Sequence, residues 1–156
     1  MAETTFTIKR EEKQIVMERV FDASRELVWK AFTDPDSLVQ WWGPGKYTTR
    51  IDKIDVKPGG AWRFIQETSE GIEYAFNGEF RDVEPPEKLS FTFEFEGVPG
   101  HIVMQTLTLT EQQGKTRVTS VAAYDSLEDL DGMVNSGMES GARESWDRLA
   151  ELIEKA

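Results

Sequence analysis

Residues 89–95 alternate strictly between large apolar and polar side chains, and this alternation constrains the fold more than any other feature of the sequence. Its apolar members are Leu89, Phe91, Phe93 and Phe95, with Ser90, Thr92 and Glu94 between them. Because successive side chains of a strand point to opposite faces, the pattern predicts a β-strand with one face in a core and one in water.

Residues 48–124 have the same extended character throughout and predict an antiparallel sheet. The expected strands are 48–56, 61–67, 72–83, 89–95, 102–109 and 116–124, and turn-forming stretches such as Pro58-Gly59-Gly60 separate them. Connections this short join antiparallel neighbours, so we expect a meander.

The segment before this sheet predicts one further strand and two short helices. Residues 14–21 are rich in β-branched and aromatic side chains and form the expected strand. Asp22 or Ser24 then caps a helix over residues 25–32. Asp34 followed by Pro35 starts a second helix, which ends at the Gly43-Pro44-Gly45 break. Residues 1–13 are polar, and we expect them to be a flexible N-terminal leader.

The last quarter of the chain predicts a short helix near 126–134 and a long amphipathic helix that runs to the C-terminus. Ser136 followed by Glu139 is a capping-box pattern for the long helix. Its apolar stripe consists of Met138, Ala142, Trp146, Leu149, Ile153 and Ala156. The element order predicts an α+β protein with one domain, residues 14–156: a curved antiparallel sheet of about 6–7 strands wraps the last helix, and two short helices follow the first strand.

Composition excludes several classes of function. The chain of 156 residues has no cysteine and one histidine, His101, which excludes disulfides and thiolate chemistry and leaves no multi-histidine metal site. Its net charge of −11 disfavours a nucleic-acid partner. With neither a signal peptide nor a long apolar stretch, the expected protein is cytoplasmic and not inserted in a membrane. We find no catalytic motif and expect no metal and no organic cofactor.

The predicted sheet presents phenylalanines to a helix whose first turns are small, with Gly137, Gly141 and Ala142 near its start. These volumes leave room for a cavity between the sheet and the helix, and side chains that interdigitate and close the space are the alternative. Strand parity places Phe64, Phe76, Phe91 and Phe93 on the cavity side.

The order and spacing of several motifs resemble the family of homologues of the heat-shock-protein-90 ATPase activator over residues 14–155. The stretches that carry the resemblance are Arg19-Val20-Phe21-Asp22-Ala23, Val28-Trp29-Lys30-Ala31, Thr33-Asp34-Pro35, Trp41-Trp42-Gly43-Pro44, Asp55-Val56-Lys57-Pro58-Gly59-Gly60-Ala61-Trp62, Gly78-Glu79-Phe80, Glu84-Pro85-Pro86-Glu87-Lys88-Leu89, Gly114-Lys115-Thr116-Arg117-Val118, and Met138, Gly141, Trp146 and Leu149. The resemblance implies the helix-grip fold of birch-pollen-allergen-like and steroidogenic-acute-regulatory lipid-transfer domains, with an internal apolar cavity.

Members of that superfamily bind lipids, sterols, flavonoids or polyketides, so the resemblance implies a binding protein for a small apolar or aromatic molecule, as a monomer or weak dimer. A stress-linked co-chaperone module is the alternative, and a cyclase- or hydratase-type enzyme the second alternative. The expected ligand-binding residues are Trp41, Trp42, Phe64, Tyr74, Phe76, Phe91, Phe93, Met138 and Trp146.

Polar groups that could orient such a ligand are Tyr74, Gln66, Gln105 and the tryptophan indoles, and parity alone does not say which of them point inward. His101 lies in a loop between two expected strands and is expected to be solvated. Glu128, Asp129 and Asp131 lack the glycine-hinged pattern of a calcium loop, so a solvated acidic face is expected there.

Overall fold

A computed structural model describes residues 3–43 and 45–154 of the chain. Its strands are β1 (Thr5–Lys9), β2 (Gln14–Phe21), β3 (Thr48–Ile54), β4 (Ala61–Glu67), β5 (Glu73–Glu84), β6 (Lys88–Phe95), β7 (Ile102–Gln112) and β8 (Lys115–Ala123). Its helices are α1 (Arg25–Thr33), α2 (Pro35–Trp41), α3 (Leu127–Asn135) and α4 (Met138–Ile153). Pro44 of the predicted chain break and Ala156 of the predicted helical stripe lie outside the described residues.

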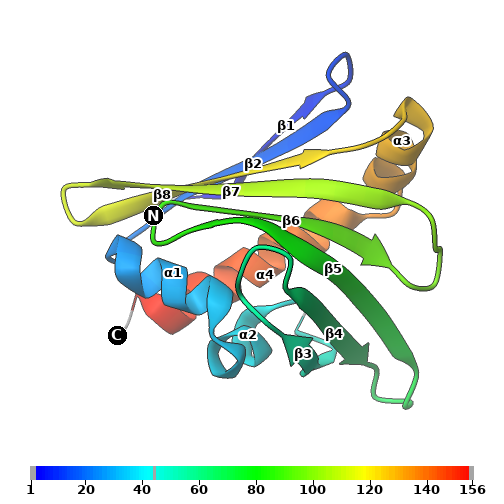
Figure 1. The fold of residues 1–156 in the computed structure, drawn as a ribbon, viewed down its shortest axis with the longest axis horizontal. Helices are drawn as coiled ribbons and strands as arrows, with labels where there is room; N and C mark the ends of the chain where they lie inside the picture. Colours follow the sequence, from blue (N-terminus) through cyan, green and yellow to red (C-terminus); the bar gives the residue numbers. More distant parts are fainter. Residues whose placement is uncertain (1–2, 44, 155–156) are drawn as a thin grey trace.

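The strands form an 8-stranded sheet in the order β1-β2-β8-β7-β6-β5-β4-β3, and every neighbouring pair is antiparallel. In Figure 1 the strongly curved sheet has α4 running across one face, with α3 at one end of that helix and α1 and α2 towards the other. We call the face towards α4 the inner face. This arrangement confirms the predicted α+β fold and the helix-grip architecture.

Caps and turns form where the local sequence favours them. Ser24 rather than Asp22 is the N-cap of α1, because its hydroxyl accepts the Leu27 amide at 3.2 Å. Asp34 accepts the Asp36 amide at 3.3 Å and Pro35 opens α2, as predicted. The core lies between the inner face and the helices, and its most buried side chains include Phe21, Leu89, Val118 and Leu149.

The prediction of a flexible leader over residues 1–13 is wrong for Thr5–Lys9, which form β1. The five residues pair with Gln14–Glu18 of β2 across a hairpin turn, where Lys13 adopts a φ of 58°. Phe6 packs on the buried cluster around Leu130, and this contact supplies the apolar anchor of the strand. The sheet therefore has eight strands rather than about 6–7, and the short helices follow the second strand.

The predicted capping box at Ser136 is also wrong. Residues up to Asn135 remain helical in α3, so Ser136 is the C-cap of that helix and its hydroxyl donates to the Met133 carbonyl at 2.6 Å. Gly137 then makes the junction to α4 with a φ of 82°, a left-handed conformation that suits glycine. The start of α4 is therefore set by a glycine turn and not by a side-chain cap.

Candidate functional site

Six aromatic side chains, from the C-cap of α2 and from three adjacent strands, meet on the inner face. We call them the aromatic cluster: Trp42, Trp62, Phe64, Phe76, Phe91 and Phe93. The register pairs Phe64 with Phe76 across β4 and β5, and the rings of Phe76 and Phe93 stack with centroids 5.5 Å apart. The ring centroid of Trp62 lies 4.8 Å from that of Phe64 and 5.9 Å from those of Phe91 and Phe93. The four phenylalanines that strand parity placed on one side of the sheet thus lie together in the structure.

Trp42 reaches this cluster from the end of α2. Its ring meets Phe64 and Phe76 edge to face, at centroid distances of 5.0 and 5.4 Å. Thr49 of β3 donates its hydroxyl to the Trp42 carbonyl at 2.7 Å. Arg148 of α4 donates to the Gly43 and Gln40 carbonyls at 2.9 and 2.7 Å. The backbone around Trp42 is therefore held from both a strand and the long helix.

The aromatic cluster is only partly covered. Trp62 and Phe64 are 3% and 5% exposed, whereas Trp42, Phe76, Phe91 and Phe93 remain half-buried although they lie on the inner face. Met138, Gly141 and Ala142 on the first turns of α4 are half-buried as well. Neither these three residues nor the four half-buried rings are fully sealed in the core.

Trp62 is the central residue that the predicted site omitted. Its indole lies against Gly78 of β5, where a Cβ would come within 2.5 Å of Nε1. Nε1 has no hydrogen-bond partner among the described residues. The signal that could have identified Trp62 was its period-2 spacing from Phe64, which places both side chains on one face of β4.

Two predicted site residues, Trp41 and Trp146, pack elsewhere in the same core. Trp41 is 3% exposed, donates its indole N–H to the Ala31 carbonyl at 2.9 Å, and meets Phe32 edge to face at 5.1 Å. Trp146 packs against Phe32 and Phe21 at 6.3 and 5.7 Å. These contacts join α1, α2 and α4.

Tyr74 lies beside the aromatic cluster rather than in it. Its half-buried ring is 5.9 Å from Tyr47 and 6.1 Å from Phe95. The register places it directly opposite Gln66 of β4 on the inner face. Gln105 of β7 also faces inward, opposite Phe91, and is half-buried.

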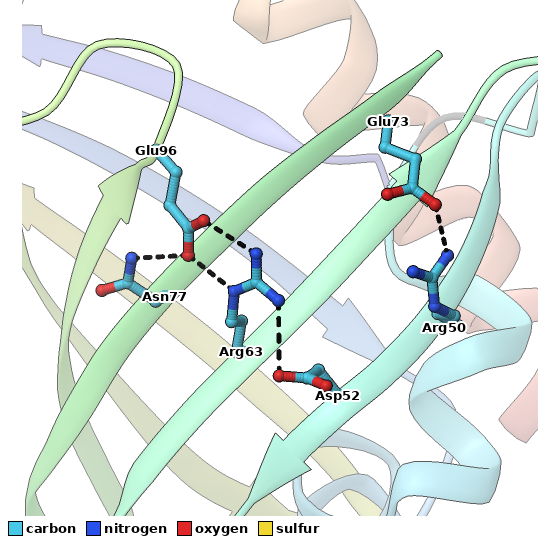
Figure 2. A network of polar contacts seen from close by, with 6 residues as sticks. All are labelled: Arg50, Asp52, Arg63, Glu73, Asn77 and Glu96. Carbon is cyan, nitrogen blue, oxygen red and sulfur yellow. Dashed lines mark hydrogen bonds and ion pairs between the residues drawn. The ribbon is translucent and has the colours of Figure 1, made fainter. Parts of the chain in front are cut away.

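The opposite, outer face of the same strands carries a network of charges (Figure 2). Arg63 donates to both carboxylate oxygens of Glu96 at 2.8 and 2.9 Å and to Asp52 at 3.3 Å, and Asn77 donates to Glu96 at 2.9 Å. The Arg63 hydrogen bonds, helped by Asn77, lower the pKa of Glu96 to about 2, and the Glu96 carboxylate raises the pKa of Arg63. This network faces away from the aromatic cluster and is not part of it.

Three further titratable residues, Tyr124, His101 and Arg10, are not members of the aromatic cluster. Burial raises the pKa of Tyr124 to about 12. His101 contacts Asp129 of α3, with 2.8 Å between Nδ1 and Oδ1, so the predicted solvated histidine links the β6–β7 loop to that helix. Arg10 pairs with Asp131. Within residues 3–43 and 45–154, no group of three or more histidine or acidic side chains is placed to hold a metal ion.

Two surface hollows lie away from the predicted site. One, of about 460 Å³, is formed by Val20 and the β7–β8 hairpin, and the other, of about 560 Å³, follows α4 from Gly137 to Asp147. Neither is lined by the aromatic cluster. None of the helices in the described part of the chain is both long and apolar enough to cross a membrane.

Comparison with protein families identifies the chain. Residues 22–154 match the AHSA1 family model, described as Activator of Hsp90 ATPase homolog 1-like protein. The chain belongs to this family. The match spans both short helices, the sheet from β3 onwards and α4, and it confirms the family that the sequence motifs resemble.

Solved structures share the AHSA1-like fold along nearly the whole chain. Protein Ms6760 from Mycobacterium smegmatis is 26% identical, with a TM-score of 0.87 and 96% of each chain covered. A protein from Arthrobacter aurescens is 24% identical, with a TM-score of 0.91 and coverage of 97% of this chain and 92% of that one. The AHSA1 protein from Silicibacter pomeroyi is 23% identical, with a TM-score of 0.73 and coverage of 88% of this chain and 95% of that one. No curated protein matches the chain.

Proposed function

We propose that this AHSA1-like domain binds a small, planar apolar molecule against the aromatic cluster. One observation carries the proposal: Trp42, Phe76, Phe91 and Phe93 remain half-buried on the face of the sheet that α4 covers. Large aromatic side chains are normally sealed in a core, and apolar surface that stays wet in a concave position favours a ligand.

The available contact area sets the affinity to expect. A two-ring molecule that hides about 200 Å² of apolar surface gains about 5 kcal/mol, and offset stacking on Trp42 or Phe76 adds about 1 kcal/mol. The costs of association and ordering reduce this gain, so simple probes should bind with Kd values between about 50 μM and 1 mM. A natural ligand that fills more of the face would bind more tightly.

The test is a titration of the ¹⁵N-labelled protein with a fatty acid, a sterol, a flavonoid and a two-ring aromatic hydrocarbon. We expect at least one class to shift the Trp42 indole and the backbone amides of β4 to β6. Trp42→Leu should weaken that binding by about fivefold or more, because it removes one wall of the site.

Trp29→Leu is the matched control, since Trp29 is a half-buried tryptophan of α1 outside the aromatic cluster. It should bind the same compound as the wild type does. If no class perturbs Phe76, Phe93 or the Trp42 indole, or if both tryptophan variants lose binding equally, the proposal is wrong.

The family description favours a second candidate function, a co-chaperone-like contact with the heat-shock ATPase. This domain would then stimulate a purified Hsp90-type ATPase, and the surface of the domain would be protected from hydrogen exchange in the complex. The absence of both binding and stimulation would remove this candidate and leave the ligand proposal untouched.

A further inference from the structure

Gln66 of β4 combines deep burial with incomplete hydrogen bonding at the edge of the aromatic cluster. The residue is 4% exposed and lies under the turn after α2, where a Cβ on Gly43 would overlap its amide nitrogen. Its Nε2 donates to the Trp42 carbonyl and to the Thr49 hydroxyl, each at 3.4 Å. Both bonds are long for N–H···O contacts.

These contacts fix which end of the amide is engaged. The Trp42 carbonyl can only accept, so the amide nitrogen must face it and the oxygen must point elsewhere. Oε1 accepts no hydrogen bond from the residues that the structure describes. In the described part of the chain, a few polar side-chain atoms are both fully buried and without a hydrogen-bond partner, and Oε1 is not one of them.

Gln66 adjoins the surface that the proposed ligand would cover. Gln66 donates to the backbone carbonyl of Trp42, and the ring of Trp42 packs on Phe64 and Phe76. In the β4–β5 register, the pair of Gln66 and Tyr74 is followed on the inner face by the pair of Phe64 and Phe76. A buried polar group left without a partner penalises any ligand that covers it and cannot bond it.

We propose that Gln66 makes this site selective for aromatic ligands that carry a hydroxyl or N–H group at the ring edge. This inference rests on the proposed function. The ligand donates to Oε1, the amide nitrogen stays on the Trp42 carbonyl, and the ring lies against Trp42 and Phe76. Purely hydrocarbon ligands are then weak binders, because they cover Oε1 without satisfying it.

The experiment compares 1-naphthol with naphthalene, two probes that share a ring system and differ by one hydroxyl. Their Kd values are measured by ¹⁵N–¹H titration on the wild type, Gln66→Met and Gln105→Met. Methionine keeps the length of glutamine and removes its amide, and Gln105 is the matched control because it also faces inward, from β7. The hydroxyl should improve binding to the wild type about three- to tenfold, the effect of one neutral hydrogen bond.

We expect Gln66→Met to abolish this preference, because naphthol loses its acceptor and naphthalene no longer covers an unsatisfied Oε1. Thr49 still holds the Trp42 carbonyl in this variant. Gln105→Met should keep the preference. Equal binding of both probes to the wild type, a preference that survives Gln66→Met, or an equal loss for both probes would overturn the role of Gln66 and leave the proposed function standing. Failure of both probes to bind the wild type would overturn the role of Gln66, and the proposed function falls as well when the fatty acid, the sterol and the flavonoid also fail to bind.

Discussion

At the scale of single residues, the ion pair between Arg63 and Glu96 shows how an exposed face can still contribute to stability. The two-pronged contact and the Asn77 hydrogen bond favour the ionised carboxylate, so the pKa of Glu96 falls from its ordinary value of 4.5 to about 2. A carboxylate with a depressed pKa in the folded state stabilises the protein above its unfolded pKa. That stability is lost as the pH falls from about 4.5 through 2.

We therefore expect Glu96→Gln to lower the free energy of unfolding at pH 7 by about 1 kcal/mol, a modest value because solvent screens this partly exposed pair. The difference from the wild type should shrink between about pH 5 and 2, where the wild-type carboxylate becomes protonated. Urea unfolding at a series of pH values measures it. The control is Glu73→Gln, which removes the more exposed Arg50 pair on the same face and should cost less (Figure 2). Equal costs, or a gap that stays constant as the pH falls, would contradict this interpretation.

At the scale of secondary-structure elements, the close packing of β4, β5 and β6 depends on Gly78, which has no side chain. A Cβ on Gly78 would overlap the Thr92 carbonyl oxygen and press on the Trp62 indole. Close by, the Glu79 amide donates to the Thr92 hydroxyl at 2.8 Å. Gly78 thus permits the close approach of backbone and indole on which the aromatic cluster is built.

Two glycine-to-alanine variants separate this packing role from the general effect of losing a glycine. Gly78→Ala should destabilise the protein by about 2–3 kcal/mol, because backbone atoms must move. Gly132→Ala in α3, where a new Cβ meets no atom within 4 Å, should stabilise it by about 0.5–1 kcal/mol through helix propensity. Thermal and urea unfolding of the two variants measure both signs. Similar values for the two would show that Gly78 is not a packing position.

At the scale of the whole molecule, the strand order separates a protected centre from two open edges. β7 and β8 are bonded on both sides and carry fully buried side chains such as Thr116 and Val118, whereas β1 and β3 are the outer strands. Opening an edge strand exposes few apolar contacts, so its amides should exchange with solvent through local rather than global unfolding.

Hydrogen exchange followed by NMR tests this order directly. Amides of β8 and the middle of β7 should exchange about 100-fold or more slowly than the β1 and β3 amides that face outward. The β1 result also tests the strand that forms in place of the expected leader. Protection of Thr5–Lys9 equal to that of β8 would contradict the strand order, and complete absence of protection would contradict the β1–β2 pairing.

The sequence alone determined the local structure, because local structure follows from residues close together in the chain. Alternation gave the faces of β4 to β6, and Asp34 with Pro35 gave the start of α2, because strand parity and helix caps are set within a few residues. Prediction from the sequence failed where the deciding contact is with a residue or element outside the local pattern. Thr5–Lys9 is a strand because β2 lies beside it, and Ser136 does not cap α4 because α3 extends as far as Asn135.

Only the tertiary structure decided which aromatic residues share a surface with water. Trp41 and Trp42 are adjacent in sequence, yet one is sealed against Ala31 and Phe32 while the other meets Phe64 and Phe76. The unused acceptor of Gln66 likewise exists because the Trp42 carbonyl, 24 residues away, engages the amide nitrogen. Burial and hydrogen bonding depend on what packs opposite a side chain, and that is a property of the folded chain and not of its local pattern.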